Sequence, residues 1–187
     1  MLIKLKPMPL EFLSNGKHVH LLSGSEVPGC TSVAKLFDDK GWMCPWAAKM
    51  AVEYVDKNLT SIEQKAIVLK EAKTAWRKKR DTAGAKGTSA HEILEKYIKA
   101  KISGIPFDLG LFSDPEVNSA VQNFLQWESE NHVEWLASEV HVGSLVNGFA
   151  GILDFLAVVN GVETLGDFKT SSGIRAEAYI QTAGLWI

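Results

Sequence analysis

The spacing of the apolar residues changes once along this chain, near Val133, and that change limits the folds open to it. Before this point the apolar residues recur at the three-to-four spacing of amphipathic helices, and after it they follow the pattern of strands. A chain with helices first and strands later is predicted to form a mixed α/β fold. Its 187 residues suffice for one domain, and no internal repeat or Pro/Gly-rich linker marks a boundary.

The part of the chain before residue 133 is predicted to be mostly helical. Helices are expected from Pro45 to Lys57, from Thr60 or Ser61 to about Arg80, from Thr88 or Ser89 to Lys101, and from Asp114 to about Glu130. The chain is expected to break at 58–60, and Gly84 and Gly87 are expected to separate the second helix from the third. A strand at 18–22, a turn at 24–29 and one or two helical turns at 31–37 are predicted near the start.

Three strands and a final helix are predicted in the last third of the chain. The strands cover 133–142, 148–160 and 162–169, and the helix covers 177–187. Asn160-Gly161 lies between two apolar runs, and this dipeptide favours the type I′ turn, whose central residues both have positive φ. The second and third strands are therefore expected to be antiparallel neighbours.

Composition and charge exclude several classes of protein. With 46% hydrophobic and 22% charged residues the chain has the composition of an ordinary folded protein rather than a disordered one. The net charge of −2 excludes a uniformly basic protein, and two cysteines are too few for a disulfide framework. We see no membrane-spanning run and no signal peptide, so a cytoplasmic location without membrane association is expected.

Two aspartates and a lysine near the predicted hairpin are the first candidates for chemistry. Asp154 lies within an apolar strand, and Asp167 and Lys169 alternate near the end of the next strand, so both of these project to the same side. Carboxylates among apolar residues are costly unless they are paired or bind a cation, and two of them suit Mg²⁺ or Mn²⁺. The alternative is an Asp167–Lys169 surface ion pair, with Asp154 at a strand bulge.

Five segments together resemble the PD-(D/E)xK nuclease superfamily, in particular its RecB-like and phage exonuclease branch, which includes the mitochondrial genome maintenance exonuclease. The resemblance covers roughly residues 84–181 and is carried by the sequence 87–95 (GTSAHEILE), Glu139, 151–154 (GILD), 167–171 (DFKTS) and Gln181. The segment 28–37 also looks like one found near the start of phage members. Two positions depart from the pattern, because the proline of the family name is absent and Leu185 replaces an aromatic residue.

The resemblance implies both a fold and a set of roles. It implies a restriction-endonuclease-like core, in which a central mixed sheet is flanked by helices, with a helical N-terminal part at 1–83 and the catalytic core at 84–187. The metal ligands would be Asp154, Asp167, His91 and the Phe168 carbonyl, the catalytic lysine would be Lys169, and Glu139 and Gln181 would assist at the site. The superfamily core ordinarily continues with a further strand, so the chain is expected to be a truncated form or to complete its sheet with another chain.

His91 can also be assessed from its helix alone. It shares a predicted helix face with Leu94, Glu95 and Ile98, and a histidine on an apolar face is more often a core residue than a metal ligand. The aspartates and the lysine downstream favour the ligand role. Glu95 could orient the imidazole, or it could pair with Lys99 instead.

A basic run at 70–80 is the candidate DNA-binding segment. It has six basic residues and one acidic residue, and the proposed contacts are Trp76, Arg77, Lys78 and Arg80. Basic side chains would bind phosphates and an aromatic ring could stack on a base, whereas the common alternative is a solvated helix face.

These observations predict a metal-dependent DNA nuclease, an exonuclease of phage or recombination and repair type, in which a metal-activated water hydrolyses the phosphodiester bond. Its expected partners are DNA with single-stranded ends and a recombination or replication protein, and a phage protein in a bacterial host would fit this role. The alternatives are a structure-specific endonuclease with the same site and a non-catalytic nuclease-fold module that binds DNA or a protein partner. A small-molecule hydrolase with the same metal centre is a third possibility.

Overall fold

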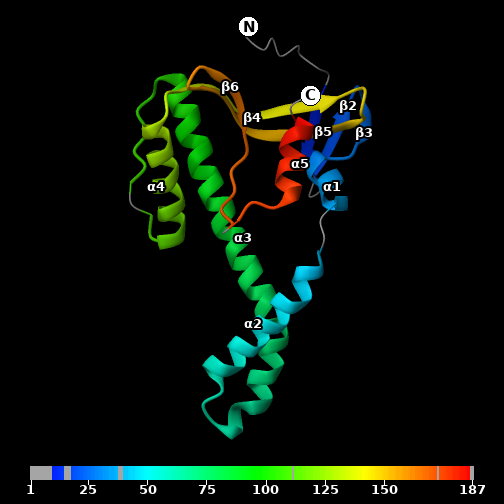
Figure 1. The fold of residues 1–187 in the computed structure, drawn as a ribbon, viewed down its shortest axis with the longest axis vertical. Helices are drawn as coiled ribbons and strands as arrows, with labels where there is room; N and C mark the ends of the chain where they lie inside the picture. Colours follow the sequence, from blue (N-terminus) through cyan, green and yellow to red (C-terminus); the bar gives the residue numbers. More distant parts are fainter. Residues whose placement is uncertain (1–9, 15–17, 38–39, 111, 172, 186–187) are drawn as a thin grey trace. The chain divides into compact units, whose positions relative to one another are not determined.

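A computed structural model describes residues 10–14, 18–37, 40–110, 112–171 and 173–185 of this mixed α/β protein (Figure 1). The chain divides into two compact units, one made of Met1–Asp38 with Ala90–Ile187 and one made of Asp39–Ser89. We call these the core unit and the helical unit. We expected one domain, with a helical part up to residue 83. The structure instead joins the first 38 residues to the second half of the chain.

The helical unit is built from two helices. Helix α2 covers Met43–Asn58, and after the 3-10 turn Ile62–Gln64 the long helix α3, Lys65–Ser103, begins. A 3-10 turn at Lys40–Trp42 precedes α2. The predicted helix at 45–57 is confirmed, and the break predicted at 58–60 begins one residue later, at Leu59.

Helix α3 corrects the sequence prediction at Gly84 and Gly87. We expected these glycines to end one helix and Thr88 or Ser89 to cap another, but the helix continues through all four residues to Ser103. The Thr88 and Ser89 hydroxyls donate to the carbonyls of Gly84 and Ala85, at 3.2 and 3.1 Å, so they bond back into the helix. A glycine in a helix costs about 1 kcal/mol, which a 39-residue helix can tolerate.

Helix α4, Pro115–Glu130, forms as its sequence predicts. The Asp114 side chain accepts hydrogen bonds from the backbone N–H groups of Glu116 and Val117, at 2.9 and 3.3 Å, and proline occupies the first helical position. Its buried residues are Val117, Val121 and Phe124, and the last two belong to the apolar core.

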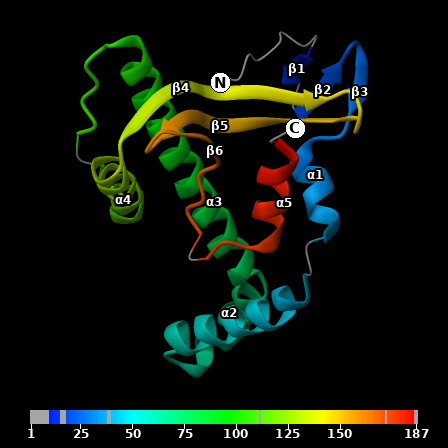
Figure 2. The ribbon, with the colours of Figure 1, turned by 45° about the horizontal axis from the view of Figure 1, so that its top comes forward.

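The sheet of the core unit consists of β4 (Val133–Ser144), β5 (Phe149–Val159) and β6 (Val162–Gly166), all antiparallel (Figure 2). The predicted turn is confirmed, because Asn160 and Gly161 have φ of 52° and 82° and join Val159 to its partner Val162. Strand β6 ends at Gly166 rather than at Lys169. Just after it, the Phe168 N–H donates to the Asp154 side chain instead of a strand carbonyl, which ends the ladder.

A second antiparallel sheet lies near the start of the chain. It contains β1 (Leu10–Ser14), β2 (His18–Leu22) and β3 (Ser25–Val27), of which only β2 was predicted. The turn expected at 24–29 is wrong, since it occupies Ser23 and Gly24 and is followed directly by β3. In both views this sheet lies beside the end of β4 and β5 where those strands connect (Figures 1 and 2).

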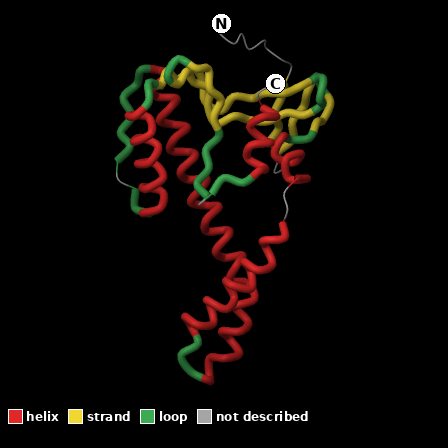
Figure 3. Tube along the Cα trace, viewed as in Figure 1, coloured by secondary structure: helices red, strands yellow, loops and turns green. Residues whose placement is uncertain are grey.

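Helix α1, Cys30–Ala34, and the 3-10 turn Lys35–Phe37 confirm the helical turns expected at 31–37. Helix α1 lies beside α5, Ala176–Leu185, which matches the described part of the predicted final helix (Figure 3). The Ala150 N–H donates to the Pro28 carbonyl at 3.1 Å, and Gly29 pairs with Ala150 in a parallel bridge. Among the described residues this bridge is the only parallel pairing, so the central mixed sheet that we expected is not seen there.

The main core of the molecule lies between α3, α4 and the sheet. Its buried members are Leu94, Tyr97, Ile98, Val121, Phe124, Phe155 and Ala157. Within the described ranges no helix has both the length and the apolar character needed to cross a bilayer.

Candidate functional site

The candidate site starts from His91 on α3 and Asp154 on β5, both in the core unit. Buried neighbours on each element, Ala90 and Leu94 on the helix and Leu153 and Phe155 on the strand, fix the orientation of the two elements. His91 Nδ1 lies 3.6 Å from Asp154 Oδ1. The helix and the sheet therefore bring together an imidazole and a carboxylate that are 63 positions apart in the sequence.

The segment after β6 joins this pair through Phe168. Its backbone N–H donates to Asp154 Oδ2, and its ring meets the His91 ring edge-on with 5.7 Å between the centroids. The same ring packs on Phe124 and Phe155, with centroid distances of 5.5 and 5.2 Å. Because the ring is held on several sides, the residues before and after it, Asp167 and Lys169, are held at the site as well.

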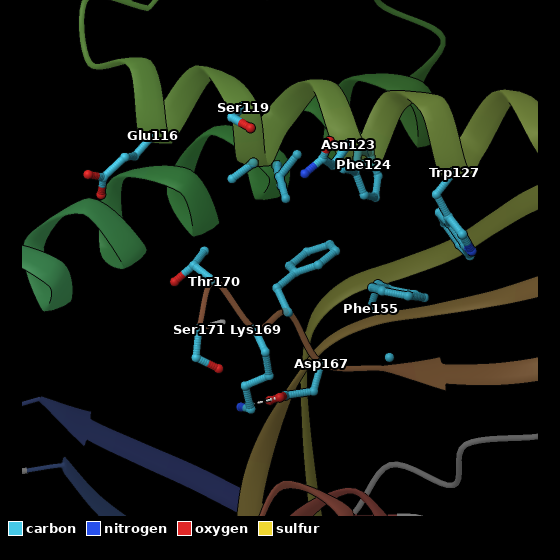
Figure 4. Close-up of a pocket in the computed structure, with 14 residues that line it drawn as sticks. Glu116, Ser119, Asn123, Phe124, Trp127, Phe155, Asp167, Lys169, Thr170 and Ser171 are labelled. Atoms are coloured by element: carbon cyan, nitrogen blue, oxygen red, sulfur yellow. Dashed lines mark ion pairs between the residues drawn. The ribbon is translucent and has the colours of Figure 1, made fainter. Parts of the chain in front are cut away.

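Asp167 and Lys169 form an ion pair, which Figure 4 marks between their side chains. Asp167 also accepts a hydrogen bond from Gln181 Nε2, with 3.4 Å between the nitrogen and Oδ1. Only 9% of the Asp167 side chain is exposed to solvent, compared with 33% for Lys169. The Asp167 carboxylate is therefore buried, and Lys169 and Gln181 each lie next to one of its two oxygens.

Helix α5 positions Gln181 and is itself anchored at the start of the chain. The Cys30 thiol donates to the Gln181 carbonyl at 3.3 Å, and burial raises the pKa of this thiol. Leu185, which replaces the expected aromatic residue, is buried against Gly151, where a Cβ would lie 2.5 Å from the leucine side chain. The close approach between α5 and β5 therefore needs glycine at position 151.

Glu139 lies on β4 in an unusual backbone conformation. The pairs Ser138–Phe155 and Val140–Leu153 place it opposite Asp154, but its φ is 54°, in the left-handed region that non-glycine residues rarely occupy. Distortions of this kind redirect side chains next to functional sites. Burial raises the pKa of Glu139, and the nearby carboxylates of Glu95 and Asp154 raise it further.

Two other titratable groups of the site also have raised pKa values. The Asp154 carboxylate raises the pKa of His91, against the opposing effect of burial. Burial raises the pKa of Asp167, and the Lys169 ammonium offsets this only in part. The folded chain therefore favours a protonated imidazole, while it disfavours a charged Asp167.

The residues that could hold a metal are of a suitable chemical type. Carboxylate oxygens from Asp154 and Asp167, with the imidazole of His91, are donors that Mg²⁺ or Mn²⁺ accepts. Within the described part of the chain, however, no group of three or more His, Cys, Asp or Glu side chains is arranged to hold an ion. The Phe168 N–H and the Lys169 ammonium now occupy one oxygen of each aspartate. A cation would have to compete with Lys169 for Asp167.

The predicted DNA-binding residues lie in the helical unit, whereas the other predicted site residues lie in the core unit. The guanidinium groups of Arg77 and Arg80 lie over the Trp76 ring, 5.2 and 5.3 Å from its centroid, and Arg80 pairs with Asp81. Arg77, Lys78 and Arg80 are exposed. This arrangement leaves the Trp76 ring covered by two cations on the exposed part of α3.

The polar residues of α4 that face the site were not predicted from the sequence. Ser119 and Asn123 line a cleft opposite Thr170 and Ser171 (Figure 4). Ser119 and Asn123 are one helical turn apart, while Val121 and Phe124 of the same helix lie in the apolar core. This spacing is a signal that could have placed the two polar residues on a second face of the helix. The sequence offered no indication of what that face lies against.

Comparison of the chain with protein-family models, with curated proteins and with solved structures finds no match.

Proposed function

We propose that this protein is a metal-dependent nuclease that hydrolyses phosphodiester bonds in DNA. One observation carries the proposal: His91, Asp154, Asp167 and Lys169 come from three separate segments and form two adjacent pairs linked by Phe168. A surface ion pair would not need a buried aspartate next to a second carboxylate and an imidazole. Such clustering of titratable groups with shifted pKa values is typical of functional sites.

The metal would be held by Asp154 and Asp167, with His91 and the Phe168 carbonyl as further ligands. When bound, Mg²⁺ or Mn²⁺ neutralises charge on the phosphate and lowers the pKa of a coordinated water. The resemblance to PD-(D/E)xK nucleases implies a restriction-endonuclease-like core, and that core is part of this proposal.

The side chains of this protein have separate tasks in the proposal. Lys169, a third exposed, supplies positive charge where the phosphorane develops negative charge. Gln181 orients the Asp167 carboxylate, and the Asp154 carboxylate orients the His91 imidazole. The Phe168 ring, packed on Phe124 and Phe155, holds the segment that carries Asp167 and Lys169 in place. The exposed basic run with Trp76 would bind the DNA backbone outside the site.

Cleavage assays with labelled single-stranded, duplex and nicked DNA test the proposal in Mg²⁺, Mn²⁺ or EDTA. Asp167→Asn and Lys169→Ala are expected to lower the rate by about 100-fold or more, because each removes charge needed in the transition state. Glu92→Gln and Lys96→Ala, on an exposed face of α3, are matched controls and should leave the rate unchanged. Cleavage in EDTA, or cleavage that survives both site substitutions, would contradict the proposal. Metal-independent DNA binding without cleavage would indicate the non-catalytic module instead.

Thermal unfolding in EDTA shows whether the inactive Asp167→Asn variant is folded. Because the pKa of Asp167 is raised in the folded chain, this group contributes stability below its unfolded pKa, and the contribution is lost as pH rises through the folded pKa. At pH 7 the neutral amide introduced by Asp167→Asn should therefore raise Tm. The gain should shrink as pH falls through the folded pKa of Asp167. A lower Tm at pH 7 would mean that the Lys169 pair outweighs burial.

A further inference from the structure

A cleft of about 620 Å³ opens beside Asp167 and Lys169, between α4 and the segment that follows β6 (Figure 4). Helix α4 contributes Ser119 and Asn123, and the opposite wall contains Thr170. This volume lies within the range of sites for small organic ligands. The cleft therefore has room for a group the size of a nucleoside next to the proposed catalytic residues.

One wall of the cleft is aromatic. Phe124, Trp127, Phe155 and Phe168 all line it, and they pack against one another with centroid distances such as 5.2 Å for Phe155–Phe168 and 6.3 Å for Trp127–Phe155. A wall of packed rings favours a flat ligand, because an aromatic ring or base can stack on it.

The polar groups of the cleft are largely uncharged. No described residue forms a hydrogen bond with the side chain of Ser119, Asn123 or Thr170, and all three are exposed, so they are open to a ligand. The amide of Asn123 can both donate and accept, which matches the edge of a nucleobase.

The charges of the cleft do not favour a phosphate inside it. Its lining contains two carboxylates, Glu116 and Asp167, and one ammonium, Lys169, which is paired with Asp167. A phosphate would meet more negative than positive charge, whereas a neutral base would not. The phosphate is better accommodated at the end of the cleft that contains Lys169, and the base is better accommodated against the aromatic wall.

We propose that this cleft binds one unstacked nucleobase of the strand that is cleaved, with Asn123 at the edge of the base. The inference rests on the proposed nuclease function and names its substrate as single-stranded or frayed nucleic acid. A base within a duplex is stacked and paired, so it would first have to leave the helix, which costs free energy.

Binding of a short single-stranded oligonucleotide in EDTA tests the cleft without cleavage. One oligonucleotide carries the fluorescent base 2-aminopurine at its terminus, and a second has an abasic site there. Stacking on the rings should quench the fluorescence, and loss of the base should weaken binding about tenfold. Asn123→Ala and the cleft-filling Ser119→Trp should each weaken binding of the intact strand by about the same factor. Gln122→Ala and Gln122→Trp, at an exposed position outside the cleft lining, are the matched controls.

The possible results separate this inference from the proposed function. The cleft assignment would be overturned if the intact and abasic strands bind equally and if Ser119→Trp and Asn123→Ala bind them as tightly as the unsubstituted protein does. This conclusion would hold even if Asp167→Asn abolishes cleavage. Base-dependent binding through Asn123, in a protein that cleaves no DNA with either metal, would support the cleft and refute the nuclease.

Discussion

The two parts of helix α3 pack very differently although they belong to one continuous helix. In the part that belongs to the helical unit, Lys65–Ser89, only Val68, Ala72 and Ala75 are buried among the apolar residues, and Ile67 and Leu69 are exposed. In the shorter part that belongs to the core unit, residues 90–103, four residues are buried: Ala90, Leu94, Tyr97 and Ile98. The first part carries the basic run and the second part carries His91.

Helical periodicity alone therefore does not locate a core. Both parts have apolar residues at helical spacing, but only the second part lies against α4 and the sheet. A side chain contributes fully to stability where it leaves water completely, so the second part should govern the stability of the site.

The largest expected difference between the two parts lies in stability. Ile98→Ala removes a side chain with no exposed surface and should lower the free energy of unfolding of the core unit by about 2–5 kcal/mol. Ile67→Ala, at a position 64% exposed, should change it by about 0.5 kcal/mol or less. Urea unfolding followed by tryptophan fluorescence and circular dichroism measures both. Equal effects would mean that the two parts of α3 contribute equally to stability.

A smaller and opposite pair of effects is expected from two glycines. At Gly166 an added Cβ would lie 1.9 Å from the Phe155 ring, which is packed on Trp135 and Phe168, so Gly166→Ala should destabilise by about 1–3 kcal/mol. At Gly84, in the first part of α3, an added Cβ meets nothing within 4 Å. Gly84→Ala should therefore stabilise by about 1 kcal/mol. Thermal unfolding of both variants gives the sign of the change in stability. Destabilisation by Gly84→Ala would contradict the exposed position of Gly84 on the first part of α3.

The smallest expected effect concerns charge on the first part of α3. The triple variant Arg77→Gln, Lys78→Gln and Arg80→Gln should lower the salt dependence of single-stranded DNA binding by about 2 in log–log slope, because fewer counterions are released. The triple variant Lys35→Gln, Lys40→Gln and Lys57→Gln removes the same charge from other exposed positions and is the control. If both variants keep the original slope, the basic run is only a solvated helix face.

Much of the fold could be predicted because short segments determine it. Asp114 with Pro115 predicted the start of α4, and Asn160-Gly161 predicted the hairpin with its positive φ values. The convergence of Asp154, Asp167 and Lys169 followed from that hairpin. The continuity of α3 could not be predicted in the same way, because two glycines carry a strong local signal against a helix. Strand β3 was missed because Ser25–Val27 is too short to show alternation.

The parts of the site that were missed depend on contacts between distant segments. Nothing local to Glu139 indicates its φ of 54°, and nothing local to Asn123 indicates a cleft beside Thr170. Such features arise only when helices and strands pack together. The chemical groups of the site can be identified from the sequence, whereas the cleft between them depends on how the elements pack.

The hydrogen bond from Cys30 to the Gln181 carbonyl joins residues 151 positions apart. On the ribosome, residues emerge in order, so α1 leaves the exit tunnel long before its partner α5 has been synthesised. The contact must then close a very long loop, which has an entropic cost. The ion pair between Asp167 and Lys169 needs only a local turn, but the hydrogen bond that Gln181 donates to Asp167 requires α5. The charged centre of the site is therefore complete only after α5 has been made and has met α1, which was made well before it.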